Sequence, residues 1–193
     1  MSDGRSLDGL GLFSDGGSMN TILTRTDRVI LEDLAKQVRE MAESDPMKQR
    51  MARWYAHNTG RSRNPMVVME LGGFHEEFMA PYPCRCEHPL AREIESSLRY
   101  RLANEQDVGD DKVITADYIV HLPVWFRIFN LEFSYVHARD AEGRALGYRQ
   151  TEFPVQDLPR DLRRLERSSW GDNRRAAEEK RQQIEDWVGE WLT

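Results

Sequence analysis

Apolar residues recur at helical spacing along much of the first half of the chain. The first helical stripe begins at Thr26 or Asp27, either of which can serve as the N-cap, and it consists of Leu31, Leu34, Ala35, Val38, Met41 and Ala42. A second helix is expected directly afterwards, because Asp45 can cap it and Pro46 suits the first helical turn.

A third helix is predicted to start at His88-Pro89, with His88 as its N-cap, and to end near Gly109. Its inner stripe is formed by Leu90, Ile94, Leu98 and Leu102. On its outer face, ion pairs are expected among Arg92, Glu95 and Arg99. The last helix is predicted from Asp172 to Leu192.

Strand patterns occupy the remaining segments. Residues 66–69 predict a short buried strand, and residues 112–122 predict a second strand that ends at Pro123. Alternation over residues 131–135, a turn over 140–143 and apolar residues near 146–148 predict a β-hairpin. The sequence therefore predicts an α+β fold, with helices packed on a small mixed or antiparallel sheet, a β-hairpin and a long C-terminal amphipathic helix.

Composition limits the organisation and the partners. Residues 1–25 are interpreted as a flexible tail or an expression remnant, and residues 26–193 as a single α+β domain. The net charge of -6 and the absence of a broad basic face argue against nucleic acid as a partner. We also expect no membrane span, and with only Cys84 and Cys86 a reducing, cytoplasmic location.

The predicted C-terminal helix carries one large apolar face, formed by Ile184, Trp187, Val188 and Trp191. Such a face must be covered. One interpretation is that it packs on the core of this domain. The other is that it forms an interface, either by self-association or with a partner chain.

Cys84, Cys86 and His88 form the one short cluster of soft metal ligands. A closed structural zinc site needs four ligands and no second cysteine pair exists, so the alternative is that Cys86 and His88 anchor the third helix.

Two further places could carry chemistry. His75 and Glu76 follow a glycine pair, where a loop could present a catalytic base, although such a sequence is also common on surfaces. His121, a candidate for catalysis or for ligand binding, lies with Trp125 and Phe126 in the most aromatic part of the chain, and these three could line a ligand pocket. The structural alternative for His121 is a hydrogen-bonded core or edge residue.

Three stretches together resemble the N-terminal region of uroporphyrinogen-decarboxylase-like proteins, in the branch associated with corrinoid methyl transfer. They are Met47-Lys48-Gln49-Arg50 with Trp54 and His57-Asn58, then Arg63-Asn64-Pro65-Met66-Val67-Val68, then Cys86-Glu87-His88-Pro89-Leu90-Ala91-Arg92-Glu93-Ile94-Glu95 with Leu98-Arg99. The resemblance extends from about Ile30 to the C-terminus.

This resemblance implies that the segment precedes a (β/α)₈ barrel, where the catalytic face and the zinc-binding His and Cys positions of the related methyltransferases would lie. The chain alone is then expected to be non-catalytic and to hold no cofactor, with corrinoid or zinc reached only through a barrel or a partner. Where tetrapyrrole decarboxylases carry arginines that hold substrate carboxylates, residues 69–77 include Glu70, Glu76 and Glu77, which disfavours that mode of porphyrinogen binding.

Three hypotheses follow. The chain is the N-terminal segment of a uroporphyrinogen-decarboxylase-like protein and acts as a lid or an assembly layer; or it is a homo-oligomeric interaction module; or it is a domain that binds a small ligand or a metal.

Overall fold

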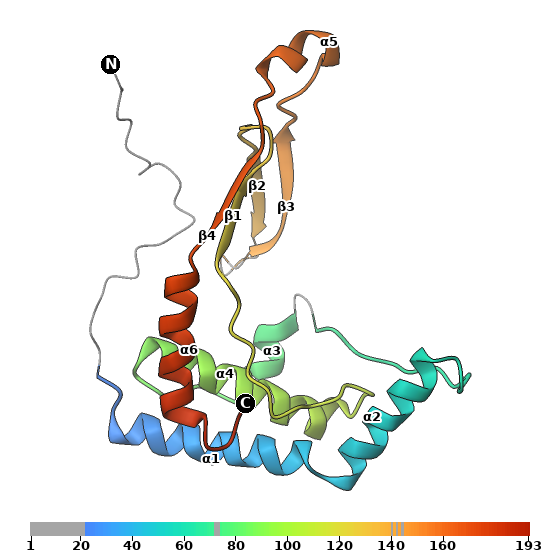
Figure 1. Ribbon diagram of the computed structural model, residues 1–193, viewed down its shortest axis with the longest axis vertical. Coiled ribbons are helices and arrows are strands. Elements are labelled where there is room, and N and C mark those ends of the chain that lie inside the picture. Colours follow the sequence, from blue (N-terminus) through green and yellow to red (C-terminus); the bar gives the residue numbers. More distant parts are fainter. Residues whose placement is uncertain (1–21, 72–73, 140, 142, 144) are drawn as a thin grey trace.

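The computed structural model describes residues 22–71, 74–139, 141, 143 and 145–193 and shows a body of helices from which a β arm projects (Figure 1). The arm comprises residues 124–172. The predicted α+β class, β-hairpin and C-terminal helix are all present. The strands, however, rise away from the helices, so the expected packing of helices on a sheet does not occur.

Five α-helices form the body: α1 (Arg25–Ala42), α2 (Asp45–Asn58), α3 (His75–Met79), α4 (Pro89–Ala103) and α6 (Arg174–Val188). A π-helical turn, η2 (Asn104–Val108), extends α4. It ends at Gly109, whose φ of 61° lies in the left-handed region that glycine adopts without strain. The predicted end of the third helix is therefore confirmed.

The helix caps explain where these helices start. Thr24 caps α1 in a capping box, in which Asp27 N donates to Thr24 Oγ1 at 3.0 Å and Thr24 N donates to an Asp27 carboxylate oxygen at 3.4 Å. The predicted caps Thr26 and Asp27 therefore already lie inside the helix. Ser44, rather than Asp45, caps α2. His88 caps α4 as predicted, because its Nδ1 accepts from Leu90 N at 3.1 Å.

The core lies where α1, α4 and α6 meet. Its buried apolar residues are Leu31, Leu34, Ala35, Val38, Met47, Cys86, Ala91, Ile94, Leu98, Ile114, Ile184, Val188 and Leu192. Burying each large aliphatic side chain contributes about 1.5–3 kcal/mol relative to exposure. Among the described residues, none of these core positions comes from the arm, so the body buries its apolar surface by itself.

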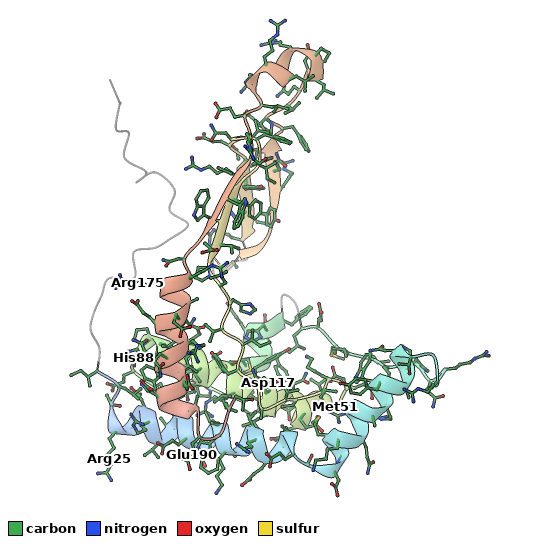
Figure 2. All side chains as sticks on the ribbon, viewed as in Figure 1. Arg25, Met51, His88, Asp117, Arg175 and Glu190 are labelled. Carbon is green, nitrogen blue, oxygen red and sulfur yellow. The ribbon has the colours of Figure 1, made fainter. Side chains whose placement is uncertain are left out.

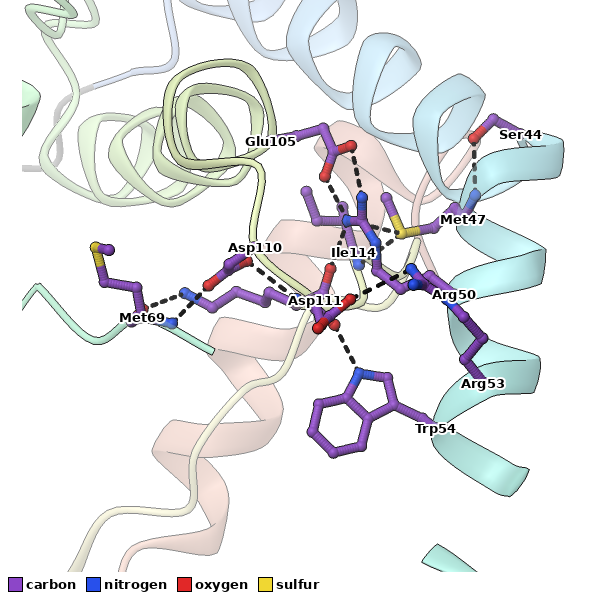
Figure 3. Close-up of polar contacts among 11 residues, drawn as sticks. Ser44, Met47, Arg50, Arg53, Trp54, Met69, Glu105, Asp110, Asp111 and Ile114 are labelled. Carbon is purple, nitrogen blue, oxygen red and sulfur yellow. Dashed lines mark hydrogen bonds and ion pairs between the residues drawn. The ribbon is translucent and has the colours of Figure 1, made fainter. Parts of the chain in front are cut away.

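Polar contacts fasten α2 to the chain that follows η2 (Figure 3). Arg50 on α2 forms a two-armed ion pair with Glu105, and its Nη1 also donates to the Lys112 carbonyl at 2.8 Å. Trp54 Nε1 donates to the Asp111 carbonyl at 2.6 Å. Because Arg50 is buried and its guanidinium fork matches the carboxylate, this contact fixes the angle of α2.

Asp110 and Asp111, which follow η2, also hold residues 66–69, the segment that was predicted as a buried strand. Val67 N donates to Asp111 Oδ2 at 2.9 Å and Met69 N donates to Asp110 Oδ2 at 2.6 Å, so aspartate side chains replace a partner strand. Residues 66–69 therefore form no strand, and Val67, Val68 and Met69 are exposed instead of buried.

The strand predicted over residues 112–122 is likewise extended without forming a strand. Its backbone-to-backbone hydrogen bonds go to the chain end: Thr193 N donates to the Ala116 carbonyl at 3.0 Å, and Tyr118 N donates to the Thr193 carbonyl at 2.9 Å. Side chains take other backbone groups, since Arg101 donates to the carbonyls of Thr115 and Asp117. The strand begins after Pro123 instead, where β4 supplies a longer partner. Of the predicted tail, residues 1–21 lie outside the described residues, and Thr24 and Arg25 already belong to the start of α1.

Replacing Leu98 by alanine is expected to lower the free energy of unfolding by about 2–5 kcal/mol, because its fully buried side chain fills the contact between α4 and α1. The matched control Val29→Ala removes an exposed side chain on α1 and should change it by less than about 0.5 kcal/mol. Urea unfolding followed by circular dichroism measures both. Equal losses in the two variants would contradict this core.

Candidate functional site: a projecting β arm

The arm consists of two antiparallel ribbons. β1 (Val124–Arg127) pairs with β4 (Ser169–Asp172), and β2 (Ser134–Arg139) pairs with β3 (Ala145–Glu152). Between β3 and β4, the chain forms the short helices α5 (Leu158–Asp161) and η3 (Leu162–Arg164) at the far end of the arm (Figure 1). β4 was missed in the sequence and assigned in part to the last helix.

A tight turn follows β1 and carries unusual backbone geometry. Leu131 N donates to the Ile128 carbonyl at 3.0 Å, and the two residues between them, Phe129 and Asn130, have φ values of 52° and 54°. Asparagine tolerates this left-handed conformation, whereas for phenylalanine it costs about 1–2 kcal/mol. Ser168 supports the strained residue, because its Oγ accepts from Phe129 N at 3.0 Å.

The register of β1 and β4 sorts their side chains onto two faces. Phe126 lies opposite Trp170, so these rings share one face, and they are 69% and 73% exposed. On the other face, Trp125 lies opposite Gly171. A Cβ on Gly171 would lie 2.8 Å from the Trp125 indole, so glycine is required for this ring to lie across the ribbon.

The second ribbon also presents aromatic rings. Tyr148 makes an edge contact with Tyr135 at a centroid distance of 5.2 Å, and it lies 5.9 Å from the His137 ring. Both tyrosines remain exposed. The contacts therefore orient the rings without removing them from water.

No apolar side chain among the described residues of the arm is fully buried. Its large exposed apolar residues are Val124, Trp125, Phe126, Ile128, Phe129, Phe133, Tyr135, Val136, Tyr148, Phe153, Leu158, Leu162 and Trp170. A two-stranded ribbon is at best marginally stable in water, and exposed apolar surface of this extent marks a contact site. The arm therefore has the composition of an interface.

Charge does not oppose such contact. Residues 124–172 contain eight arginines and eight aspartates or glutamates, whereas the whole chain has a net charge of -6.

Near the tip of the arm, Arg164 pairs with Asp161 at 3.5 Å. Asp161 is buried and accepts from Gln156 N and Asp157 N, which holds the tip together.

The candidate ligand residues His121, Trp125 and Phe126 lie along one run but do not close a pocket with one another. His121 is exposed in the segment that leads into the arm. The shallow hollow beside it is lined by its neighbours Val120 and Leu122 and by residues of α6. Trp125 and Phe126 point to opposite faces of β1, so they serve the arm surface.

The Cys84–His88 segment is anchored by two buried carboxylates that the sequence analysis missed. Glu95 Oε2 accepts from Arg85 N at 2.8 Å and from Cys86 N at 2.7 Å, while its Oε1 binds the Arg99 guanidinium at 2.8 Å. Asp27 Oδ1 accepts from Glu87 N at 2.8 Å. Glu95 was predicted on the outer face of its helix, yet it is 0% exposed, because residues 84–88 fold over it.

Cys84, Cys86 and His88 are each engaged in protein contacts. Burial, reinforced by Glu95 and Asp27, raises the pKa of the Cys86 thiol far above its ordinary value, which opposes the thiolate that metals bind. The Cys84 pKa is also raised, first by burial. His88 Nδ1 accepts from the start of α4. Within the described ranges, no three metal-ligating side chains come together.

The catalytic candidates His75 and Glu76 lie on α3, which is only five residues long, and both are exposed. The His75 ring lies 5.2 Å from the Tyr100 ring. This contact docks α3 on α4.

The face of α6 predicted as an interface is used inside the chain. Ile184 and Val188 belong to the core, and Trp187 and Trp191 are partly buried against it. Trp187 also makes an edge contact with His88 at 5.0 Å, and His88 lies beside α6 in Figure 2. The interpretation that this face packs on the chain's own core is therefore confirmed. Its use as an interface stays a prediction, for which only the partly exposed Trp187 and Trp191 remain accessible.

Comparison of the chain with protein-family models, curated protein sequences and solved structures found no match. None of the described helices combines the length and the apolar character needed to span a bilayer. Functional inference therefore rests on the residues of this chain.

The buried carboxylates predict a pH dependence of stability. Burial alone would raise the pKa of Glu95 and of Asp27, but their hydrogen bonds hold both below the ordinary values of 4.5 and 3.8. Because the folded-state pKa is depressed, the stabilisation is present above these values and is lost as the pH falls from about 5 towards 3.

Glu95→Gln is expected to lower the free energy of unfolding at pH 7 by about 2 kcal/mol and to flatten part of this acid-side slope. Urea midpoints between pH 7 and 3 measure both effects. Glu40→Gln, the same change at an exposed position of α1, is the control. An acid-side slope that is identical in Glu95→Gln and in the parent would exclude this role of Glu95.

Proposed function

We propose that this chain is a non-catalytic assembly module of the uroporphyrinogen-decarboxylase-like class, in which the β arm docks on a (β/α)₈ barrel body. The observation that carries the proposal is the arm itself, which exposes large apolar side chains and contributes no described residue to the core. The resemblance of residues 30–193 supplies the expected partner. Corrinoid or zinc chemistry would then belong to the barrel.

The physical basis is the unequal stability of the two parts. The body buries a core between three long helices, whereas the arm is held by hydrogen bonds and an ion pair, and none of its described apolar side chains is fully buried. Docking would remove these rings from water at about 25 cal/mol per Å² of apolar surface. Phe126 and Trp170 are the central anchors, because exposed aromatic residues on one face of a strand pair have the properties of interface hot spots.

A second candidate is self-association through the same arm. Each strand of the two ribbons has one edge without a strand partner among the described residues, and the arm is charge-neutral, so two arms can approach without net repulsion. On this alternative the isolated chain is a dimer at micromolar concentration. Sedimentation separates the candidates, since docking on a barrel leaves the isolated chain monomeric.

The test of the first candidate uses the reading frame that follows this chain in its genome, which should encode a (β/α)₈ domain. Co-expression of the two should give a complex, and Phe126→Ser/Trp170→Ser should weaken it at least about a hundredfold, because each hot-spot ring accounts for about tenfold or more. Isothermal titration calorimetry measures the affinity.

The control is Tyr55→Ser/Phe74→Ser, which removes two exposed aromatic rings from the body instead of the arm. It should leave the affinity within about threefold of the parent. The proposal fails if no barrel domain binds, or if the control weakens binding as much as the arm variant.

A further inference from the structure

A cleft of about 340 Å³ opens between α1 and α4 on the body, away from the residues discussed for the arm. Ile30, Leu34, Leu102 and Ala103 give it an apolar part of its lining. Tyr82 and Arg85, from the segment that precedes α4, also line it. This volume lies at the small end of the range for ligand pockets.

Two arginines border the cleft, and one buried carboxylate holds the guanidinium of Arg99 and the backbone of Arg85. Arg99 is held by Glu95 Oε1 through its Nε and Nη2, which leaves Nη1 without a protein partner among the described residues. Arg85 is fixed through its backbone, because its N donates to Glu95 Oε2 at 2.8 Å. Its side chain forms no hydrogen bond or ion pair with a described protein group, and it lines the cleft.

The opposite wall carries the counter-charge. Asp33 on α1 also lines the cleft, where its Oδ2 accepts from Gln37 Nε2 at 2.8 Å. The cations therefore come from α4 and the preceding segment, whereas the single lining carboxylate comes from α1 and already has a donor. Glu95 lies behind the lining, where its charge is matched by Arg99 and by two backbone N–H groups.

We propose that this cleft binds a small organic carboxylate with an apolar body. The Arg85 guanidinium offers the planar fork that matches a carboxylate, and Arg99 adds one further donor that is already oriented. The apolar lining residues, Leu34 and Leu102 among them, take the rest of the ligand. Arg85 and Arg99 are binding residues, and Glu95 is a positioning residue that orients the Arg99 guanidinium and holds the backbone at Arg85.

The test is a titration of the ¹⁵N-labelled full chain with benzoate, followed by NMR. Benzoate should shift the amide signals of Ile30, Gln37 and Gln106 with a Kd on the order of 1 mM. Inorganic phosphate, which lacks an apolar body, and benzamide, which lacks the charge, should each bind at least about tenfold more weakly.

Two variants should move the affinity in opposite directions. Arg85→Gln is expected to weaken benzoate binding about tenfold, and Asp33→Asn to strengthen it about threefold by removing a like charge. Arg28→Gln, at an exposed position of α1 outside the cleft, should leave it unchanged. Because Arg85 is exposed and its side chain forms no hydrogen bond or ion pair with a described group, its variant should keep the thermal midpoint of the parent.

The proposal is overturned if no cleft signal moves at 50 mM benzoate (about fifty times the expected Kd), or if benzamide or phosphate binds as tightly as benzoate. It is also overturned if Arg85→Gln and Asp33→Asn change the affinity in the same direction. Failure here leaves the docking of the arm untouched, since the two sites share no residue.

Discussion

The body is organised around the buried carboxylate of Glu95. One oxygen takes two backbone N–H groups of residues 85–86, and the other takes the guanidinium of Arg99. A buried charge is tolerable only when it is paired and hydrogen-bonded, and here the two N–H groups come from the short segment that also contacts Asp27 on α1, while the guanidinium comes from α4 itself. The relative position of α1, α4 and the chain between α3 and α4 follows from this arrangement.

The arm obeys a different rule. Its strands satisfy backbone hydrogen bonds in pairs, but none of its described apolar side chains is fully buried, and the turn at Phe129 retains backbone strain. Glycine at that position would relieve the strain. The aromatic ring at position 129 is instead exposed and available for contact. This agrees with an arm that packs against the surface of another protein.

Much of the body could be predicted from sequence because its signals are local. The apolar stripe of α1, the His88-Pro89 start of α4 and Gly109 at its end each depend on neighbours within a few residues. The burial of Glu95 could not be predicted in this way. A glutamate four residues before an arginine is typical of an ion pair on a helix surface, and Glu95 is buried only because residues 84–88 pack over it. β4 also escaped, because Ser169-Trp170-Gly171-Asp172 has no alternation and becomes a strand only beside β1. Trp125 and Phe126 were recognised as candidates from aromatic content, whereas Trp170, their partner across the ribbon, was not.

The two legs of the arm leave the body side by side. Asn173 N donates to the Pro123 carbonyl at 2.9 Å, so forty-nine residues of arm are spanned by one hydrogen bond at its base. The arm thus begins and ends at two adjacent residues of the body, and neither of them belongs to the helical core. Insertions, deletions and substitutions within the arm can therefore accumulate without disturbing the packing of the helices. The binding specificity of the arm can then diverge while the helical body stays constant.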